Sequence, residues 1–451
     1  MNVKMFNVIL LGFGFMFVFT AFQTGGLIQK IILDSIQAED PTYTGDGYVS
    51  LAVIYAVFAI SNWISPSIIT FLGPKYTMFV GAVTYNIFIA QFLVPVTWGL
   101  YAASVAIGFG AALIWTGQGN FLTINSNSTT MSRNSGIFWA MLQCSLIWGN
   151  IFVYVQFQGL EHIDKATRTT VFGALTGVGI LGMLLILILR GGGLPSRSLA
   201  TDADSPEGEG GPPSVVKPVG SSDFVQALVK SLRLGKTRRM LTLSASFFYT
   251  GLELSFFSGV YGACLGFTKS FGKDSSKFLG INGLLIGAGE ITGETTHSCY
   301  RRSVVGCFHL TFPPLFASLD HTNPPNCHVS RLFCIKIRSC APLQLGCVCG
   351  SGCGSTIGQS LSLIGFIEIS NPHFDFHVVI MQAVAAAVAF FYSNYLLLPY
   401  QLLILVVCGT LGTLSFWLVE WETYVEHKAS RPDRSNESST SSSATSPLEQ
   451  P

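Results

Sequence analysis

The sequence is poor in charged residues. Lys, Arg, Asp and Glu make up 11% of its 451 residues, whereas a soluble globular chain carries roughly 25%. The two signs nearly cancel, and the formal net charge is +1. Because nucleic-acid binding requires a basic surface, this balance predicts no nucleic-acid partner. The shortage of charge also indicates that most of the chain is not surrounded by water.

Motifs of enzymes and metal proteins are missing as well. The sequence has no G-x-x-x-x-G-K-[ST] phosphate loop, no H-E-x-x-H metal helix and no G-x-S-x-G nucleophile turn. Glycines inside the apolar runs are better explained by close helix packing than by phosphate binding. The sequence therefore predicts a protein that is not an enzyme, with no catalytic residues, no cofactor and no metal site.

Long apolar runs dominate what is present. Hydrophobic residues make up 49% of the chain, and many fall in runs of about 20, the length at which a helix crosses a bilayer. Lipid offers the backbone no hydrogen bonds, so each run is predicted to be helical. The first is too long for a signal-peptide core and is expected to be an uncleaved span. Six precede a polar gap and four follow it: Met5–Ile28, Val49–Thr70, Thr77–Pro95, Gly99–Ile124, Gly136–Phe157, Val171–Leu189, Met240–Phe267, Phe278–Gly293, Val378–Leu398 and Leu402–Val419.

The polar gap divides the chain into a first half, 1–189, and a second half, 240–420. Of the 33 residues in Arg190–Ser222, 18 are Gly, Pro or Ser, which predicts a flexible linker. Phe224–Leu234 has one apolar face and a basic exit, and this pattern predicts an amphipathic helix on an anionic membrane surface at the end of the linker 190–239. A solvated charge run is the alternative. The Ser-rich residues 421–451 predict a disordered tail.

Basic residues also predict the orientation. Lys and Arg near span ends stay in the cytosol, and five of them lie between residues 230 and 239. They predict a cytosolic linker and, after an even number of spans, cytosolic amino and carboxyl termini. The sequon at Asn127 would then be cytosolic and unglycosylated. The sequence leaves open whether the membrane is the plasma membrane or an endolysosomal one.

Residues 294–355 break the apolar pattern. They contain eight of the 11 cysteines and four of the eight histidines. One interpretation is a Cys/His metal module, although no Cys-x-x-Cys or His-x-His pair supports it. A second is a luminal disulfide loop. The third, which the abrupt change of composition favours, is a shifted reading frame or alternative exon that replaces two spans.

Five stretches resemble the Unc-93-like branch of the major facilitator superfamily: Phe15–Thr24, Ala103–Ser126, Arg133–Asn150, Tyr249–Gly262 and Ala386–Leu398. The resemblance implies an all-α polytopic membrane protein with a major facilitator-like, two-halved helix bundle. Of the twelve spans in that family, about ten or eleven are recognisable here. It also implies a substrate cavity between the halves. The charged loop typical of the superfamily is replaced by Gly73-Pro74-Lys75-Tyr76, without Asp or Arg.

Two acids inside apolar runs are candidates for proton coupling. Glu253 lies midway along Met240–Phe267, and Glu290 lies in Phe278–Gly293. A carboxylate at bilayer depth costs several kcal/mol unless it is partnered, hydrated or protonated. These acids would either couple a proton to a conformational change or, as protonated groups, make an interhelical hydrogen bond.

Three amides are candidates for a solute cavity. Gln118 and Asn120 lie in the fourth run and Asn150 lies in the fifth. They would hydrogen-bond a small polar solute, or else hold helices together at about 0.6 kcal/mol each.

Two functions therefore remain open. The first is an orphan secondary solute carrier that works by alternating access and moves a polar solute or a proton. The second is a non-transporting subunit that regulates or traffics a channel or receptor, as the resemblance to Unc-93-like proteins implies. In both, the lipid bilayer is the constant partner.

Overall fold

The computed structural model describes residues 3–127, 129–157, 163–191, 233, 236–266, 278–288 and 372–429. Within these ranges every regular element is a helix. Six helices there are long and apolar enough to cross a bilayer, which confirms the predicted class. The amphipathic segment 224–234, apart from Arg233, and the Cys-rich segment 294–355 lie outside the described residues.

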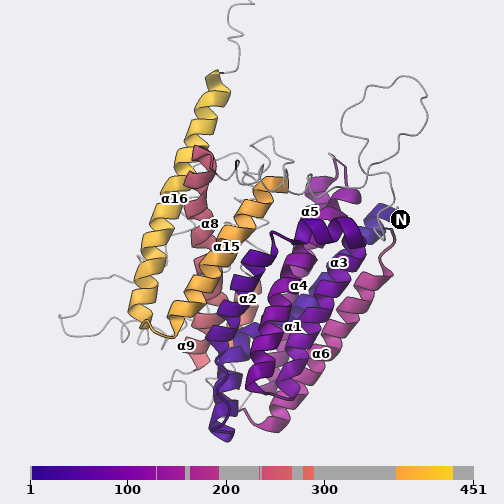
Figure 1. The fold of residues 1–451 in the computed structure, drawn as a ribbon, viewed down its shortest axis with the longest axis vertical. Coiled ribbons are helices and arrows are strands. Elements are labelled where there is room, and N and C mark those ends of the chain that lie inside the picture. The colour runs from indigo at the N-terminus through magenta and orange to yellow at the C-terminus, as the bar shows by residue number, and fades with distance from the viewer. Residues whose placement is uncertain are drawn as a thin grey trace, which may run out of the picture.

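The first half is a bundle of six helices packed side by side (Figure 1). Asp46 accepts a hydrogen bond from the Val49 amide and so caps the second helix, and Asp164 caps the sixth through the Thr167 amide. Such caps satisfy amides that have no partner within the helix. The helices are α1 (Val3–Glu39), α2 (Gly47–Ser61), α3 (Ser65–Ala90), α4 (Thr97–Ile124), α5 (Met131–Gln156) and α6 (Lys165–Ile188), with the short η1 (Gln91–Leu93) after α3.

The predicted single span Val49–Thr70 is wrong. Helix α2 ends at Ser61 and α3 begins at Ser65, with a proline in its first turn. Helix α3 is itself interrupted at Gly73, whose φ is +73°, immediately before Pro74. Glycine adopts this left-handed conformation readily, and proline removes the next backbone donor, so the pair breaks the helix that the apolar pattern alone would continue.

The second half contains a helix with a change of pitch. Helix α8 (Arg238–Ser255) passes into the π-helix η2 (Phe256–Tyr261) and then into α9 (Gly262–Gly266). π-Helical turns are rare in proteins, and those that occur are frequently found at functional sites. A separate helical segment spans Phe278–Ala288. Helices α15 (Pro372–Ser393) and α16 (Leu398–Ala429) both pack against α8.

Helix α16 also corrects the predicted tail. It continues to Ala429, so residues 421–429 are helical rather than disordered. Arg238 at the start of α8 pairs with Glu422 at 3.3 Å, and Arg239 pairs with Glu426. These ion pairs hold the polar end of α16 against the start of α8 and so stabilise its last helical turns. Residues 430–451 lie outside the described residues.

The two halves meet along three lines of contact. Helix α15 packs along α2, η2 and α9 touch α1, and Phe278–Ala288 packs on α5. Phe390 of α15 is buried, and its ring stacks on Tyr55 of α2 at 5.7 Å between centroids. The same ring lies against Gly259 of η2, where a Cβ would come within 2.5 Å. One aromatic side chain thus fills the junction of both halves.

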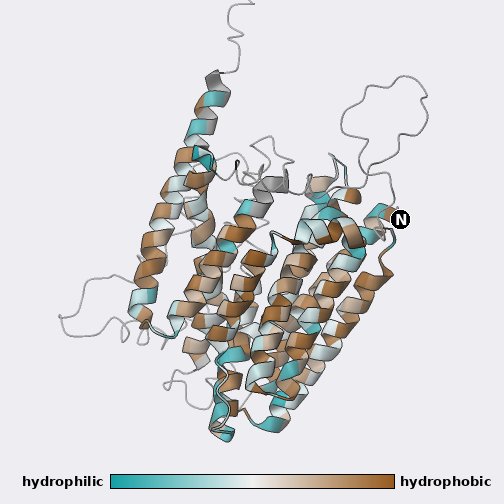
Figure 2. Ribbon diagram, in the orientation of Figure 1, coloured by the Kyte–Doolittle hydropathy of each residue, from teal (hydrophilic) through white to brown (hydrophobic). Residues whose placement is uncertain are grey.

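Hydropathy follows the long axis of the helices. Apolar residues cover the bodies of the helices, and polar residues gather toward the ends of the bundle (Figure 2). Large apolar side chains such as Phe71 and Trp98 are about three-quarters exposed, at 77% and 76%. In water this would be costly, whereas lipid accommodates it.

Candidate functional site between the two halves

Polar side chains gather at two ends of the bundle. The amino-terminal face is the end that holds the start of α1. There Asn7 donates to the Asn125 Oδ1 at 2.8 Å and to the Arg190 carbonyl at 2.7 Å, and the Arg190 amide donates back at 3.1 Å. Asn134 donates to Ser126 in the same region. This amino-terminal network joins α1, α4 and α5 to Arg190, which follows α6, the last helix of the first half.

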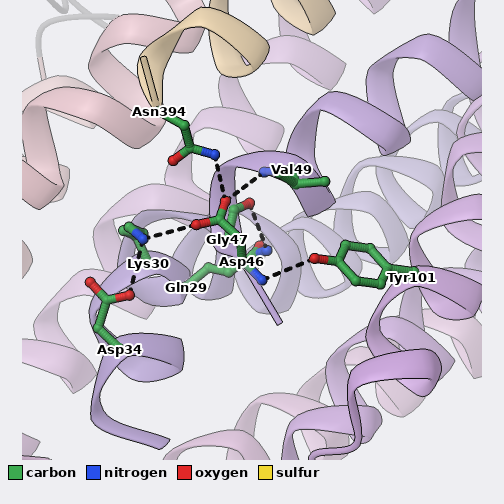
Figure 3. Close-up of polar contacts among 8 residues, drawn as sticks. All are labelled: Gln29, Lys30, Asp34, Asp46, Gly47, Val49, Tyr101 and Asn394. Atoms are coloured by element: carbon green, nitrogen blue, oxygen red, sulfur yellow. Dashed lines mark hydrogen bonds and ion pairs between the residues drawn. The ribbon is translucent and has the colours of Figure 1, made fainter. Parts of the chain in front are cut away.

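A second network lies at the opposite face (Figure 3). Lys30 of α1 pairs with Asp34 at 3.0 Å and with Asp46 at 3.1 Å. The Asp46 amide donates to the Tyr101 hydroxyl of α4 at 3.1 Å. Gln29 donates to the Gly47 carbonyl at 3.2 Å. The loop between α1 and α2 is therefore held by contacts with α1 and with α4.

Asp46 also reaches across to the second half. The side-chain amide of Asn394, just after α15, donates to the Asp46 Oδ1 at 2.8 Å (Figure 3). We call this contact the cross-half tie. The same oxygen accepts from the Val49 amide at 2.8 Å. A single carboxylate therefore caps α2, pairs with α1 and holds α15, and a hydrogen bond to an ionised acceptor is stronger than a neutral one.

The electrostatics of Asp46 favour its charged form. Partial burial alone would raise the pKa of Asp46, but the hydrogen bonds from Asn394 and Val49 and the positive charge of Lys30 outweigh it, and the net pKa lies below its usual range. The cross-half tie therefore keeps its ionised acceptor at neutral and mildly acidic pH.

Deeper in the bilayer, a glycine stripe brings the halves together. Gly280, Gly283 and Gly287 face α5, and a Cβ on any of them would come within 3.0 Å of α5 atoms. At Gly283 those atoms belong to the Asn150 side chain, at 2.1–2.2 Å. Small residues allow helices to approach this closely in membranes. The stripe therefore presses the backbone of the second half against a polar side chain of the first.

Three polar side chains at this contact have buried atoms that lack hydrogen-bond partners in the described structure. Asn150 is 1% exposed and donates to its own helix through Leu146, but its Oδ1 has no partner. Asn282 is 3% exposed, and neither polar atom of its amide is bonded. Thr24 of α1 is fully buried with an unbonded hydroxyl, beside Gly149. We call Thr24, Asn150 and Asn282 the seam cluster.

The predicted site residues lie at two depths. Gln118 is buried on α4 and Asn120 is exposed, and both lie about two turns or less from Ile124, where α4 ends. Asn150 is 19 positions after Met131, where α5 begins at the same face, which is about 28 Å of helix. The candidate amides therefore do not form one cluster.

The two candidate acids have different outcomes. Glu253 is buried, 6% exposed, on α8 and lies three residues before η2. It lies 15 positions after Arg238, or about 22 Å along the helix from the start of α8. Glu290 lies outside the described residues. Proton coupling by either acid stays a prediction.

Sequence reasoning missed Asn282, Asp46 and Asn394. The Asp46-Gly47 pair ahead of an apolar run was a readable capping signal. Asn394 lies inside the family-like stretch Ala386–Leu398, but no local pattern connects positions 348 residues apart. The stripe Gly280-x-x-Gly283-x-x-x-Gly287 has small-residue spacing, which could have drawn attention to Asn282.

Comparisons with known proteins agree with this architecture. A peptide transporter of the POT type, crystallised with sulfate, superposes with a TM-score of 0.56 at 13% identity over 94% of each chain. A structure of proton-dependent oligopeptide transporters gives 0.53 at 13% identity over 95% of this chain and all of that one. At such identity the likeness concerns the fold alone.

Sequence relatives are more specific. The profile of the family described as "Ion channel regulatory protein UNC-93" matches residues 40–307. The UNC93-like protein MFSD11 of Xenopus laevis is 39% identical over 93% of this chain and 96% of its own length. The unc-93 homolog A protein of Danio rerio is 27% identical over 56% of this chain and 58% of its own length.

The fold thus defines a multi-pass membrane protein of the major facilitator type, with two helical halves that meet along a polar and glycine-rich contact. Within that class, the chain belongs to the UNC-93 family. The resemblance to the Unc-93-like branch, inferred from the five sequence stretches, is confirmed.

Proposed function

We propose that this protein is a secondary solute carrier that works by alternating access. In this scheme the halves rock about a central site, and one end of the bundle closes while the other opens. The described structure would correspond to the state in which the opposite face is closed. A net transport direction and a coupling ion are not part of the proposal.

The cross-half tie is the observation that carries this proposal. A permanent helix junction is best made by apolar packing, as in the contact of Phe390 with Tyr55. The tie instead uses one amide and one carboxylate at the rim, where Asn394 is exposed. Water can replace a solvent-exposed hydrogen bond at little net cost. The contact is therefore well suited to break and form in each cycle.

The orientation proposed here puts the amino-terminal face in the cytosol. Lys4, Lys75 and Arg133 would lie on that side, and an even number of preceding spans would put the five basic residues between 230 and 239 there as well. Basic residues near span ends are retained in the cytosol. The cross-half tie would then close the carrier toward the lumen or the exterior.

Uptake into liposomes tests the carrier directly. Purified full-length protein would be reconstituted, given an isotope-labelled mixture of polar metabolites, and assayed for saturable accumulation by mass spectrometry, with proton flux followed in parallel. We expect at least one solute to accumulate, with a lower rate in the Asp46→Ala variant. Neither saturable uptake nor proton flux in well-oriented, folded protein would overturn the proposal.

A regulatory subunit is the second candidate, and the loop before Lys75 favours it. The chain breaks at Gly73-Pro74, and no Asp or Arg occupies the stretch where the superfamily has a charged loop. The matched family is also described as ion channel regulatory. Stable co-purification with one channel or receptor, together with no flux in liposomes, would favour this candidate.

A further inference from the structure

Three buried polar groups from both halves lie along one series of contacts just inside the opposite face. Thr24 belongs to α1, Asn150 to α5 and Asn282 to the segment Phe278–Ala288. Gly149 and Gly283 connect them, since a Cβ on Gly149 would lie 1.8 Å from the Thr24 hydroxyl and one on Gly283 would overlap the Asn150 amide. Asn282 faces Gly262 of α9, whose Cβ position is 3.9 Å from the Asn282 Nδ2 and 3.4 Å from the Leu27 carbonyl.

The unbonded atoms of the seam cluster are unusual on energetic grounds. More than nine in ten buried polar groups in proteins have a hydrogen-bond partner, and each exception destabilises the folded protein. Here the Thr24 hydroxyl, the Asn150 Oδ1 and both polar atoms of Asn282 are exceptions among the described residues. Asn125, which joins helices within the first half, is by contrast bonded to Asn7 and to the Phe121 carbonyl.

Their position points to a ligand rather than to a packing role. Lys30, which closes the opposite face through Asp46, is only six positions beyond Thr24, or about 9 Å along α1. The cluster is also divided between the halves, so a molecule bound to it would contact both. In an alternating-access carrier such a molecule would be held or released as the halves move.

We infer that Thr24, Asn150 and Asn282 form a binding subsite for an uncharged polar solute, such as a primary amide or a polyol. This inference rests on the proposed function and specifies its substrate class. The Asn282 Nδ2 requires an acceptor, whereas its Oδ1 and the Asn150 Oδ1 require donors. One solute that carries both kinds of group satisfies all three, and no member of the cluster is charged.

The first test uses protein without added solute. Leu has the same number of side-chain heavy atoms as Asn but no polar group. Asn282→Leu and Asn150→Leu are therefore expected to raise the melting temperature of the full-length protein in detergent by about 2 °C each, because an unpaired polar group is removed. Asn125→Leu is the matched control and should lower it, since that amide is bonded. A lower melting temperature in both seam variants would assign them a structural role and overturn the inference.

The second test adds solutes. Nicotinamide, urea, glycerol and myo-inositol are the neutral probes, and citrate and spermidine are the charged comparison. We expect at least one neutral probe to raise the melting temperature of the wild type, and the shift to vanish in Asn282→Leu. No shift with any neutral probe, or shifts with the charged probes alone, would overturn the solute class. Both tests measure equilibrium stability and need no flux. The subsite inference can therefore fail while liposome uptake supports the carrier, and the carrier proposal can fail while both melting tests support the subsite.

Discussion

The polar networks at the two ends of the bundle look alike but join different things. The amino-terminal network of Asn7, Asn125 and Arg190 connects helices of the first half only. The network at the opposite face contains the ion pairs of Lys30 as well, and its Asn394–Asp46 contact crosses between the halves. The Asn7–Asn125 bond of the first is buried, whereas Asn394 in the second is exposed.

We therefore expect the amino-terminal network to affect the stability of the fold, and the cross-half tie to affect the balance between two conformations. Breaking a buried network leaves donors and acceptors without partners, which costs the full penalty of burying them. Breaking an exposed cross-half bond returns its groups to water and changes the preference between two conformations. The variants below act on one network at a time, beginning with the largest expected effect.

Asn7→Leu should produce the largest loss of stability. It removes three hydrogen bonds at once and leaves the Asn125 Oδ1 and both backbone groups of Arg190 without their partner. We expect a loss of about 2 kcal/mol, measured as a lower melting temperature of the purified protein. Asn120→Leu, at an exposed amide of α4, is the control and should change little. Equal melting temperatures for the two variants would contradict a structural role for this network.

Asp46→Ala should have an intermediate effect because three roles are lost together. The cap of α2 contributes about 1 kcal/mol, and the pair with Lys30 and the cross-half tie are removed with it. Asp46→Ser separates the roles, since Ser caps a helix without charge. We expect Ser to restore most of the stability but not the closed opposite face, which cysteine labelling of nearby buried positions would report. Full recovery of both stability and closure in Asp46→Ser would argue against a role for the cross-half tie in closing this face.

Asn394→Ala should barely affect stability. The side chain is exposed, so the expected change is within about 0.5 kcal/mol. Its effect should appear instead as a several-fold faster modification of a cysteine placed at Ala386, a position of α15 that is buried while this face is closed and lies about two turns before Asn394. An unchanged rate, with the wild-type melting temperature, would mean that apolar packing alone keeps this face closed.

Mild acid should have the smallest effect. Because the pKa of Asp46 is lowered, the tie contributes fully above the usual carboxyl value of about 4 and is lost only as the pH falls through the lowered pKa. Between about pH 7 and pH 5 we expect no change in the labelling of a cysteine at buried Ala386. A clear opening near pH 6 would require another titrating group, with buried Glu253 the first candidate to replace by Gln.

The sequence predicted the elements well and their contacts poorly. Long apolar runs locate helices in lipid because hydropathy there is nearly sufficient, and the starts of α4 and α5 fall within a few residues of those predicted. The break at Gly73 was not predicted because one glycine and one proline hardly alter the hydropathy of an apolar run. The helical polar end of α16 was not predicted because its ion pairs join residues 184 and 187 positions apart.

The candidate site shows the same limit. Asn150 was identified from its residue type inside an apolar run, and it does lie where the halves meet. Gln118 and Asn120 were chosen on equal grounds but lie toward the end of α4 at the amino-terminal face. Depth along a helix can be counted from sequence, whereas the partner across the seam, Asn282, depends on how two halves dock.

The distance across the opposite face tests the central claim most directly. Spin labels would be introduced as unnatural amino acids at Thr42 and Tyr395, two exposed positions on either side of the tie, so that native cysteines stay unmodified. In lipid nanodiscs, electron resonance should give mainly one short distance in the wild type and a mixture of short and long distances in Asn394→Ala. A single unchanged distance in both proteins would contradict a tie that opens and closes.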